Sequence, residues 1–120
     1  MANTLAPAAI NHVMNGSAKH WCALNSKNNP ITIRDSFNLS SVSDSGTGDH
    51  TVNFSSNFAS GLNYAVTGSG NQEHNNTGYY VRMISPINLS NSSFRFFCSH
   101  TNADKSDFTY IGIEAQGDLA

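Results

Sequence analysis

Charged residues are scarce in this sequence. Only 12% of the 120 residues are Asp, Glu, Lys or Arg, and six basic against eight acidic side chains leave a net charge of -2. A typical globular domain carries about twice that share of charge. Binding to nucleic acid through phosphate neutralisation needs clustered Lys and Arg, whereas the six basic residues here are scattered along the chain. We therefore expect no nucleic-acid partner.

Long apolar runs are also missing. No stretch approaches the roughly 18 apolar residues that a transmembrane helix needs. The first residues, Met1-Ala-Asn-Thr-Leu-Ala-Pro7, lack the basic end and the continuous apolar stretch that are typical of a secretion signal. We therefore expect a protein that is made in the cytoplasm and has no membrane partner.

Cysteine is rare, with Cys22 and Cys98 as its two occurrences. Two cysteines in a chain of this length do not form a disulfide scaffold. We expect buried free thiols, because small apolar sulfhydryls are common in protein cores; a bridge between the two is the alternative. His20 lies two residues before Cys22, which suggests a nucleophile with a nearby base. Nothing besides this adjacency supports such a pair, because no third residue is placed to orient the imidazole.

Motifs for metal binding or catalysis are weak. The five histidines form no H-x-H or H-E-x-x-H pattern. The string Asp44-Ser-Gly-Thr-Gly-Asp49 superficially resembles a calcium loop, but it lacks the further carboxylates and the distal Glu that such a loop needs. We expect a hairpin turn there, no cofactor, no metal and no catalytic residue; a hydrolase is the least favoured class.

The polarity comes from uncharged residues instead, with 16 Asn, 17 Ser and 8 Thr. From residue 19 onward, short alternating runs are separated by turn residues about every ten positions, which is typical of an all-β sandwich or barrel. The predicted strands are His20–Asn25, Thr32–Phe37, Ser40–Ser43, His50–Phe54, Tyr64–Thr67, Tyr79–Ile84, Phe94–His100 and Phe108–Ala115.

The period of two predicts which side chains form the core. Phe94, Phe96 and Cys98 share one face of a strand, while Arg95, Phe97 and Ser99 share the other. The remaining predicted core sets are Ile111, Ile113 and Ala115; Val52 and Phe54; and Ile31, Ile33 and, beyond a kink, Phe37.

Residues 67–78 are predicted to form a long, exposed polar loop. Loops rich in amides and hydroxyls can bind sugars when aromatic rings lie nearby. We therefore treat this loop as a candidate glycan-contact loop. Its candidate residues are Asn71, His74, Asn75, Asn76, Tyr79 and Tyr80. The segments Phe37–Val42 and Ile87–Ser92 resemble one another, and we attribute this similarity to composition.

Residues 1–18 lack the short alternating runs of the β domain, which we assign to residues 19–120. Leu5 to Met14 could form two helical turns, but so short a helix is marginal in water and needs a surface to lie on. We expect an N-terminal arm that docks on a neighbouring subunit or on its own sheet, with a loose tail as the alternative. The candidate partner-binding residues of the arm are Leu5, Ile10, Val13 and Met14.

One segment is more specific than any of these patterns: Ile33-Arg-Asp-Ser-Phe-Asn-Leu-Ser-Ser-Val-Ser-Asp-Ser-Gly-Thr-Gly-Asp-His-Thr-Val-Asn-Phe54. It resembles a segment that recurs in small β domains of tailed-bacteriophage virion proteins, many of them labelled tail fibres. The flanks are similar in layout, with a Trp-containing strand before the segment (Trp21) and a short strand, Asn63 to Val66, after it. The chain departs from that family at Cys22-Ala-Leu24, where an apolar-polar-Phe run is usual.

The resemblance implies a virion structural protein without catalytic residues, assembled in the host cytoplasm. We therefore expect an antiparallel, jelly-roll-like β-sandwich in a homo-oligomer, with a trimer favoured. Two placements compete. The short extent of chain outside the β domain favours a capsid decoration or cement protein that contacts the major capsid protein. The alternative is a tail-fibre or spike component that contacts tail proteins and host polysaccharide.

Overall fold

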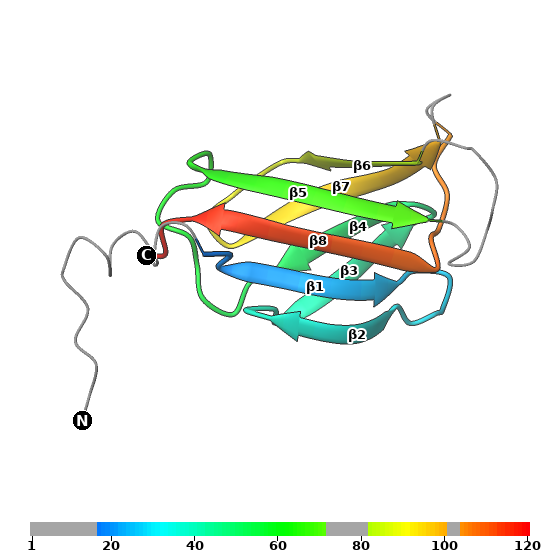
Figure 1. Cartoon of the computed structure of the whole chain (residues 1–120), viewed down its shortest axis with the longest axis horizontal. Helices are drawn as coiled ribbons and strands as arrows, with labels where there is room; N and C mark the ends of the chain where they lie inside the picture. Colours follow the sequence, from blue (N-terminus) through cyan, green and yellow to red (C-terminus); the bar gives the residue numbers. More distant parts are fainter. Residues whose placement is uncertain (1–16, 72–81, 101–103) are drawn as a thin grey trace.

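Two packed antiparallel sheets make up the described part of the chain (Figure 1). The computed structural model describes residues 17–71, 82–100 and 104–120. The predicted all-β sandwich is confirmed, while its jelly-roll-like detail is not. The arm residues Leu5, Ile10, Val13 and Met14 lie outside the described residues.

Each sheet has four strands. Sheet A has the order β2-β1-β8-β5, and sheet B has the order β3-β4-β7-β6. The strands are β1 (His20–Asn25), β2 (Thr32–Phe37), β3 (Ser41–Gly46), β4 (Asp49–Asn53), β5 (Tyr64–Asn71), β6 (Arg82–Ile87), β7 (Ser93–His100) and β8 (Tyr110–Gly117).

Each predicted strand overlaps an observed one, but β3, β5, β6 and β8 continue beyond their predicted ends, and residues 79–81 of the predicted strand Tyr79–Ile84 lie outside the described residues. The prediction of a loop from Thr67 onward is wrong for its first part, because β5 continues to Asn71 and pairs with β8 over its whole length. The turn residues Gly68 and Gly70 are accommodated in the strand because β8 supplies backbone partners for them. Residues 72–78 of the predicted loop lie outside the described residues.

The core lies between the sheets and follows the predicted alternation. The side chains of Phe94, Phe96 and Cys98 are fully buried, as are those of Val52 and Ile111. Each such apolar side chain contributes about 1.5–3 kcal/mol when it is removed from water. Aromatic rings dominate one end of the core. The centre of the Phe54 ring lies within 6 Å of the ring centres of His20, Phe58, Tyr64 and Phe94.

Two residues predicted to lie in the core are exposed instead. Ile33 is 43% and Phe37 is 52% exposed, both on the edge strand β2. Asp35 pairs with Ala23 but Ile33 pairs with Leu24, so Arg34 is an extra residue in β2. This β-bulge reverses the alternation beyond it. Phe37 therefore lies beside the outward-facing Trp21, while Ile33 keeps the inner face but is not covered by sheet B.

The connections after β2 and β6 share a feature that composition does not explain. Asn38 and Asn88 both have positive φ, at 54° and 50°. Each ends its strand and is followed by a leucine, Leu39 or Leu89, that packs against the core. Asn adopts the left-handed conformation more readily than most residues. The similarity of the two segments therefore reflects a shared turn, and our attribution of it to composition is wrong.

Candidate functional site

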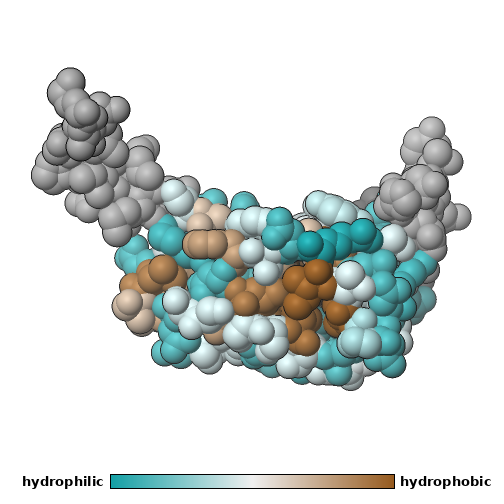
Figure 2. Space-filling model, turned by 90° about the horizontal axis from the view of Figure 1, so that it is seen from below, coloured by the Kyte–Doolittle hydropathy of each residue, from teal (hydrophilic) through white to brown (hydrophobic). Residues whose placement is uncertain are grey.

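The side of the sandwich between β2 and β3 is open. The edge strands β5 and β6 pack against one another, whereas β2 and β3 barely touch. Apolar side chains gather on this side in Figure 2, which views the molecule from below. We call this surface the open side and define it by Ile31, Ile33, Leu39 and Val42, with Phe37 at its rim.

Next to this rim lies a hollow of about 360 Å³ that includes Phe37, Leu39 and Leu119 among its lining residues. Leu119 is itself an exposed apolar residue. A free edge strand with apolar neighbours can accept a further strand or loop from another chain. The opposite charges of Arg34 and Asp35 lie on the same strand, and they make uncontrolled edge-to-edge pairing less favourable.

Asn38 fixes the geometry of the open side. Its Nδ2 donates to the carbonyl oxygens of Lys19, at 2.9 Å, and Ser56, at 3.0 Å, and its Oδ1 accepts from the Ser56 backbone N–H at 2.6 Å. The Asn38 carbonyl oxygen lies 3.2 Å from Nδ1 of the buried His20. Asn38 therefore ties the β2–β3 connection to the segment before β1 and to the segment after β4.

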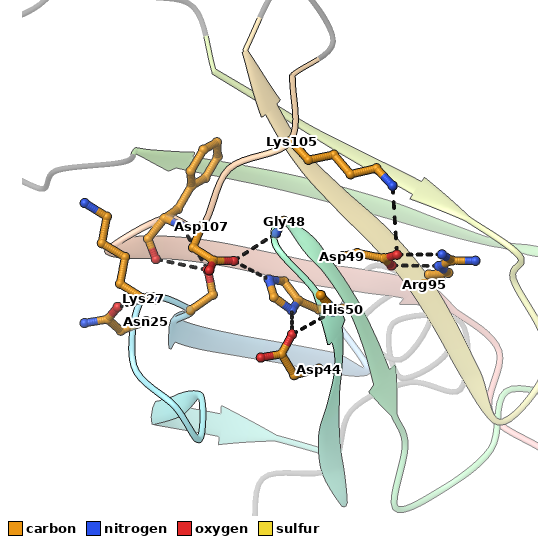
Figure 3. Close-up of polar contacts among 12 residues, drawn as sticks. Asn25, Lys27, Asp44, Gly48, Asp49, His50, Arg95, Lys105 and Asp107 are labelled. Atoms are coloured by element: carbon orange, nitrogen blue, oxygen red, sulfur yellow. Dashed lines mark hydrogen bonds and ion pairs between the residues drawn. The ribbon is translucent and has the colours of Figure 1, made fainter.

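A second polar cluster holds the β3–β4 hairpin (Figure 3). The Gly48 backbone N–H donates to Oδ1 of Asp107 at 2.8 Å, and the Cys98 backbone N–H donates to the Gly48 carbonyl oxygen at 2.9 Å. His50 lies between two carboxylates, with Nδ1 3.3 Å from Asp44 and Nε2 3.6 Å from Asp107. We call Asp44, Gly48, His50 and Asp107 the hairpin clasp.

The imidazole of the clasp is shielded from solvent. The His50 ring is fully buried, and within the described chain neither of its nitrogens makes a well-aligned hydrogen bond. Burial lowers the pKa of His50, although the carboxylates of Asp44, Asp107 and Asp49 oppose that shift. A ring that no substrate can reach orients its neighbours but does not exchange protons with a ligand.

Beside the clasp, a charged pair crosses from β4 to β7. Arg95 binds Asp49 through two hydrogen bonds, of 2.7 Å from Nε and 2.6 Å from an Nη. This contact lowers the pKa of Asp49. The Lys105 Nζ lies 4.0 Å from the same carboxylate and 4.2 Å from the centre of the Phe97 ring. Phe97 thus faces outward, as the alternation predicts, and lies beneath two cations.

The thiols of Cys22 and Cys98 are free and buried, as expected. Burial raises the pKa of each to about 12. A thiol with so high a pKa carries almost no thiolate at neutral pH and is a poor nucleophile. The described residues contain no group of three or more His, Cys, Asp or Glu side chains that could hold a metal ion.

The candidate glycan-contact residues are only partly placed. Asn71 is half-buried at the end of β5, where it pairs with Tyr110 of β8. His74, Asn75, Asn76, Tyr79 and Tyr80 lie outside the described residues. Among those described, no helix is long and apolar enough to cross a membrane.

The open side was not predicted from the sequence, because the alternation of Ile31 and Ile33 also predicts a buried strand. The available signal was the adjacent pair Arg34 and Asp35, which is unusual in a strand that is covered on both faces. Searches against protein-family models, curated proteins and solved structures find no match to this chain.

Proposed function

We propose that this protein is a non-enzymatic structural component of a bacteriophage particle that attaches to the capsid through its open side. The observation that carries the proposal is a group of partly exposed apolar side chains beside the edge strand β2, with Ile33 and Phe37 as its most exposed members. The segment that resembles phage virion proteins, residues 33–54, contains most of β2 and all of β3 and β4. The same segment therefore contains every residue of the open side except Ile31.

The chemistry of this surface suits the major capsid protein as its partner. Apolar side chains supply the energy of association, and the free backbone groups of β2 add directional hydrogen bonds. Few charges surround them, so attachment depends little on ionic strength. In the same proposal the chains associate as trimers in the virion, and Leu5, Ile10, Val13 and Met14 of the arm hold a neighbouring subunit.

The proposal is tested by capsid occupancy. The variant carries both Ile33→Ser and Phe37→Ser. The matched control is Met83→Ser, which alters an exposed apolar residue on β6, the edge strand of sheet B on the side away from β2 and β3. Purified heads that lack this protein are mixed with each variant and imaged by cryo-electron microscopy. We expect the double variant to lose capsid density and the control to retain it.

Circular dichroism establishes that each variant is folded before it is mixed with heads. Full occupancy by a folded Ile33→Ser, Phe37→Ser variant would overturn attachment through the open side. Removal of residues 1–16 tests the arm in the same assay, with reduced occupancy as the expected result.

A second candidate is a tail-fibre or spike component that contacts host polysaccharide. The observation that favours it is the exposure of two aromatic residues, Trp21 and Tyr110, on one face of sheet A. Electron microscopy of particles that carry labelled protein distinguishes the placements, because density on every capsomer supports the first and density at the tail supports the second.

A further inference from the structure

The outer face of sheet A carries a groove that the proposed attachment does not use. The groove has a volume of about 550 Å³ and is lined from β1, β5 and β8. Strand pairing arranges its side chains in rows across the sheet. One row contains Trp21, Glu114 and Thr67, and the next contains Ala23, Gly112 and Ser69.

The groove exists because the second row is small. Ala23, Gly112 and Ser69 leave a low floor between two larger neighbours, Trp21 on one side and Tyr110 on the other. Trp21 pairs with Glu114, and Glu114 lies four positions from Tyr110 along β8. The attachment points of the two aromatic side chains are therefore about 13 Å apart along the strands. That span exceeds a single sugar ring and suits a short oligosaccharide.

Gly112 determines how the Tyr110 ring lies. A Cβ atom at Gly112 would be 2.6 Å from the Tyr110 hydroxyl, and the next nearest atoms also belong to the Tyr110 ring. The ring therefore leans along β8 over Gly112, and Tyr110 remains 43% exposed. Trp21 at the other end of the groove is 38% exposed. Both rings are available to a ligand that lies along the groove.

The polar groups of the groove are suited to hydroxyls. Thr67 Oγ1 donates to Glu114 Oε1 at 3.3 Å, and Ser69 lies beside them. Glu114 is the only charged side chain among the described residues that line the groove. Asp35, which pairs with Ala23 from β2, adds a second carboxylate at its edge. Carboxylates accept hydrogen bonds from hydroxyls and repel anions.

We propose that this groove binds a neutral oligosaccharide, with Trp21 and Tyr110 against the sugar rings and Glu114, Thr67 and Ser69 bonding to hydroxyls. Aromatic rings present an apolar face that matches the C–H face of a sugar ring, and a few polar groups then fix its orientation. Single-stranded nucleic acid also stacks on aromatic rings, but it needs a positively charged groove. The groove does not include Ile31, Ile33, Leu39 or Val42 of the open side, although Phe37 at the rim pairs with Trp21. A saccharide bound there is also the kind of ligand that the second candidate function requires.

Trp21 provides the direct assay, because it is the only tryptophan of the chain. The probes are maltohexaose, chitohexaose and mannohexaose as neutral saccharides, a galacturonate hexamer as the acidic counterpart, and a decaproline peptide. We expect at least one neutral hexamer to shift the Trp21 emission and to give saturable heat in calorimetry. The galacturonate hexamer and decaproline should give neither signal.

Three substitutions assign the binding to the groove. Tyr110→Ala should weaken binding on the order of tenfold. Gly112→Ala should weaken it several-fold while leaving the fold intact, because the three atoms nearest to its new Cβ all belong to the movable Tyr110 side chain. Tyr110→Phe with Gly112→Ala should bind better than Gly112→Ala alone, because the clashing hydroxyl is gone. The control is Phe97→Ala, which removes an aromatic ring on sheet B.

The proposal is overturned if no neutral hexamer binds, if galacturonate or decaproline binds equally well, or if Tyr110→Ala binds like the parent. The capsid assay separates this inference from the proposed function. Tyr110→Ala and Gly112→Ala should keep full capsid occupancy while binding saccharide more weakly, whereas the open-side variant should lose capsid occupancy.

Discussion

The two lateral sides of the sandwich are held together by different means. On the β5/β6 side, apolar side chains close the gap between the sheets. Side-chain atoms of Ile84 and Ile113 approach to 3.0 and 3.1 Å of the position that a Cβ of Gly68 would occupy. On the β2/β3 side, Ile33 stays exposed, and the strands are positioned by Asn38 and by the hairpin clasp.

This difference shows how a small domain can leave apolar surface available without losing its shape. Backbone and side-chain hydrogen bonds fix the β2–β3 connection and the β3–β4 hairpin, so the apolar side chains between them need not be buried to hold the edge in place. A surface that is rigid before it binds loses less conformational entropy on association.

The largest expected effect comes from the clasp. Gly48 has a φ of 61°, and a Cβ there would lie 2.6 Å from the Cys98 carbonyl oxygen and 2.7 Å from the Ser106 backbone nitrogen. Gly48→Ala should therefore lower the free energy of unfolding by about 3 kcal/mol or more. Gly46→Ala is the control, because its φ of 141° is also strained but no atom lies within 4 Å. Equal losses in urea titrations would contradict a steric role for the clasp.

Two isoleucines on edge strands, Ile84 on β6 and Ile33 on β2, test the difference between the two lateral sides. Ile84→Ala on the closed side should cost about 2 kcal/mol, because it opens a gap against the core. Ile33→Ala on the open side should cost less than about 1 kcal/mol, because much of its side chain is already in water. Urea unfolding of both variants measures the difference. A loss for Ile33→Ala as large as that for Ile84→Ala would mean that the open side is covered in the isolated protein.

Asn38 and Asn88 both have positive φ, so substitutions at these two positions distinguish the effect of backbone conformation from the effect of side-chain hydrogen bonds. Asn38→Gly keeps the positive φ but removes three hydrogen bonds, so stability should fall by about 1–2 kcal/mol. Asn88→Gly keeps the same conformation at an exposed position and should change stability by less than about 0.5 kcal/mol. Thermal unfolding of the pair checks this. Similar losses would show that the conformation alone matters.

The smallest expected effect is a dependence on pH. Burial lowers the pKa of both His20 and His50 below 6.5, against opposing contributions from the Asn38 and Phe37 carbonyls for His20 and from nearby carboxylates for His50. The unfolded chain then takes up protons at higher pH than the folded chain. Stability should be full above about pH 6.5 and should fall as the pH drops toward the folded pKa values.

Urea unfolding at pH 7.5 and pH 5.5 measures this change. The lowered pKa of Asp49 has the same sign, but it acts below its ordinary value of 3.8 and so lies outside that window. Stability that is constant or rises between pH 7.5 and pH 5.5 would contradict burial of the two neutral imidazoles.

Much of the fold could be predicted because strand alternation is local. The faces of β7 and β8 follow from the period of two, and the hairpin between β3 and β4 follows from its glycines. The predictions were wrong where a partner strand sets the local structure, at the bulge beside Arg34 and in the extension of β5 to Asn71.

The candidate sites were harder to predict than the strands. The groove depends on the pairing of β1 and β5 with β8, which brings Trp21, Thr67 and Glu114 into one row although they are far apart in the sequence. No local pattern specifies that register. The open side depends on how far β3 lies from β2, which is likewise a property of the packed sheets.

An all-β chain with little charge, the approximate positions of its strands and most of its core follow from residue composition and from alternation between neighbouring residues. Which apolar side chains stay in water, and which small residues line up between two aromatic rings, depends on how the strands pair and pack. Burial and register are set by what lies across the sheet, and those partners come from distant parts of the chain.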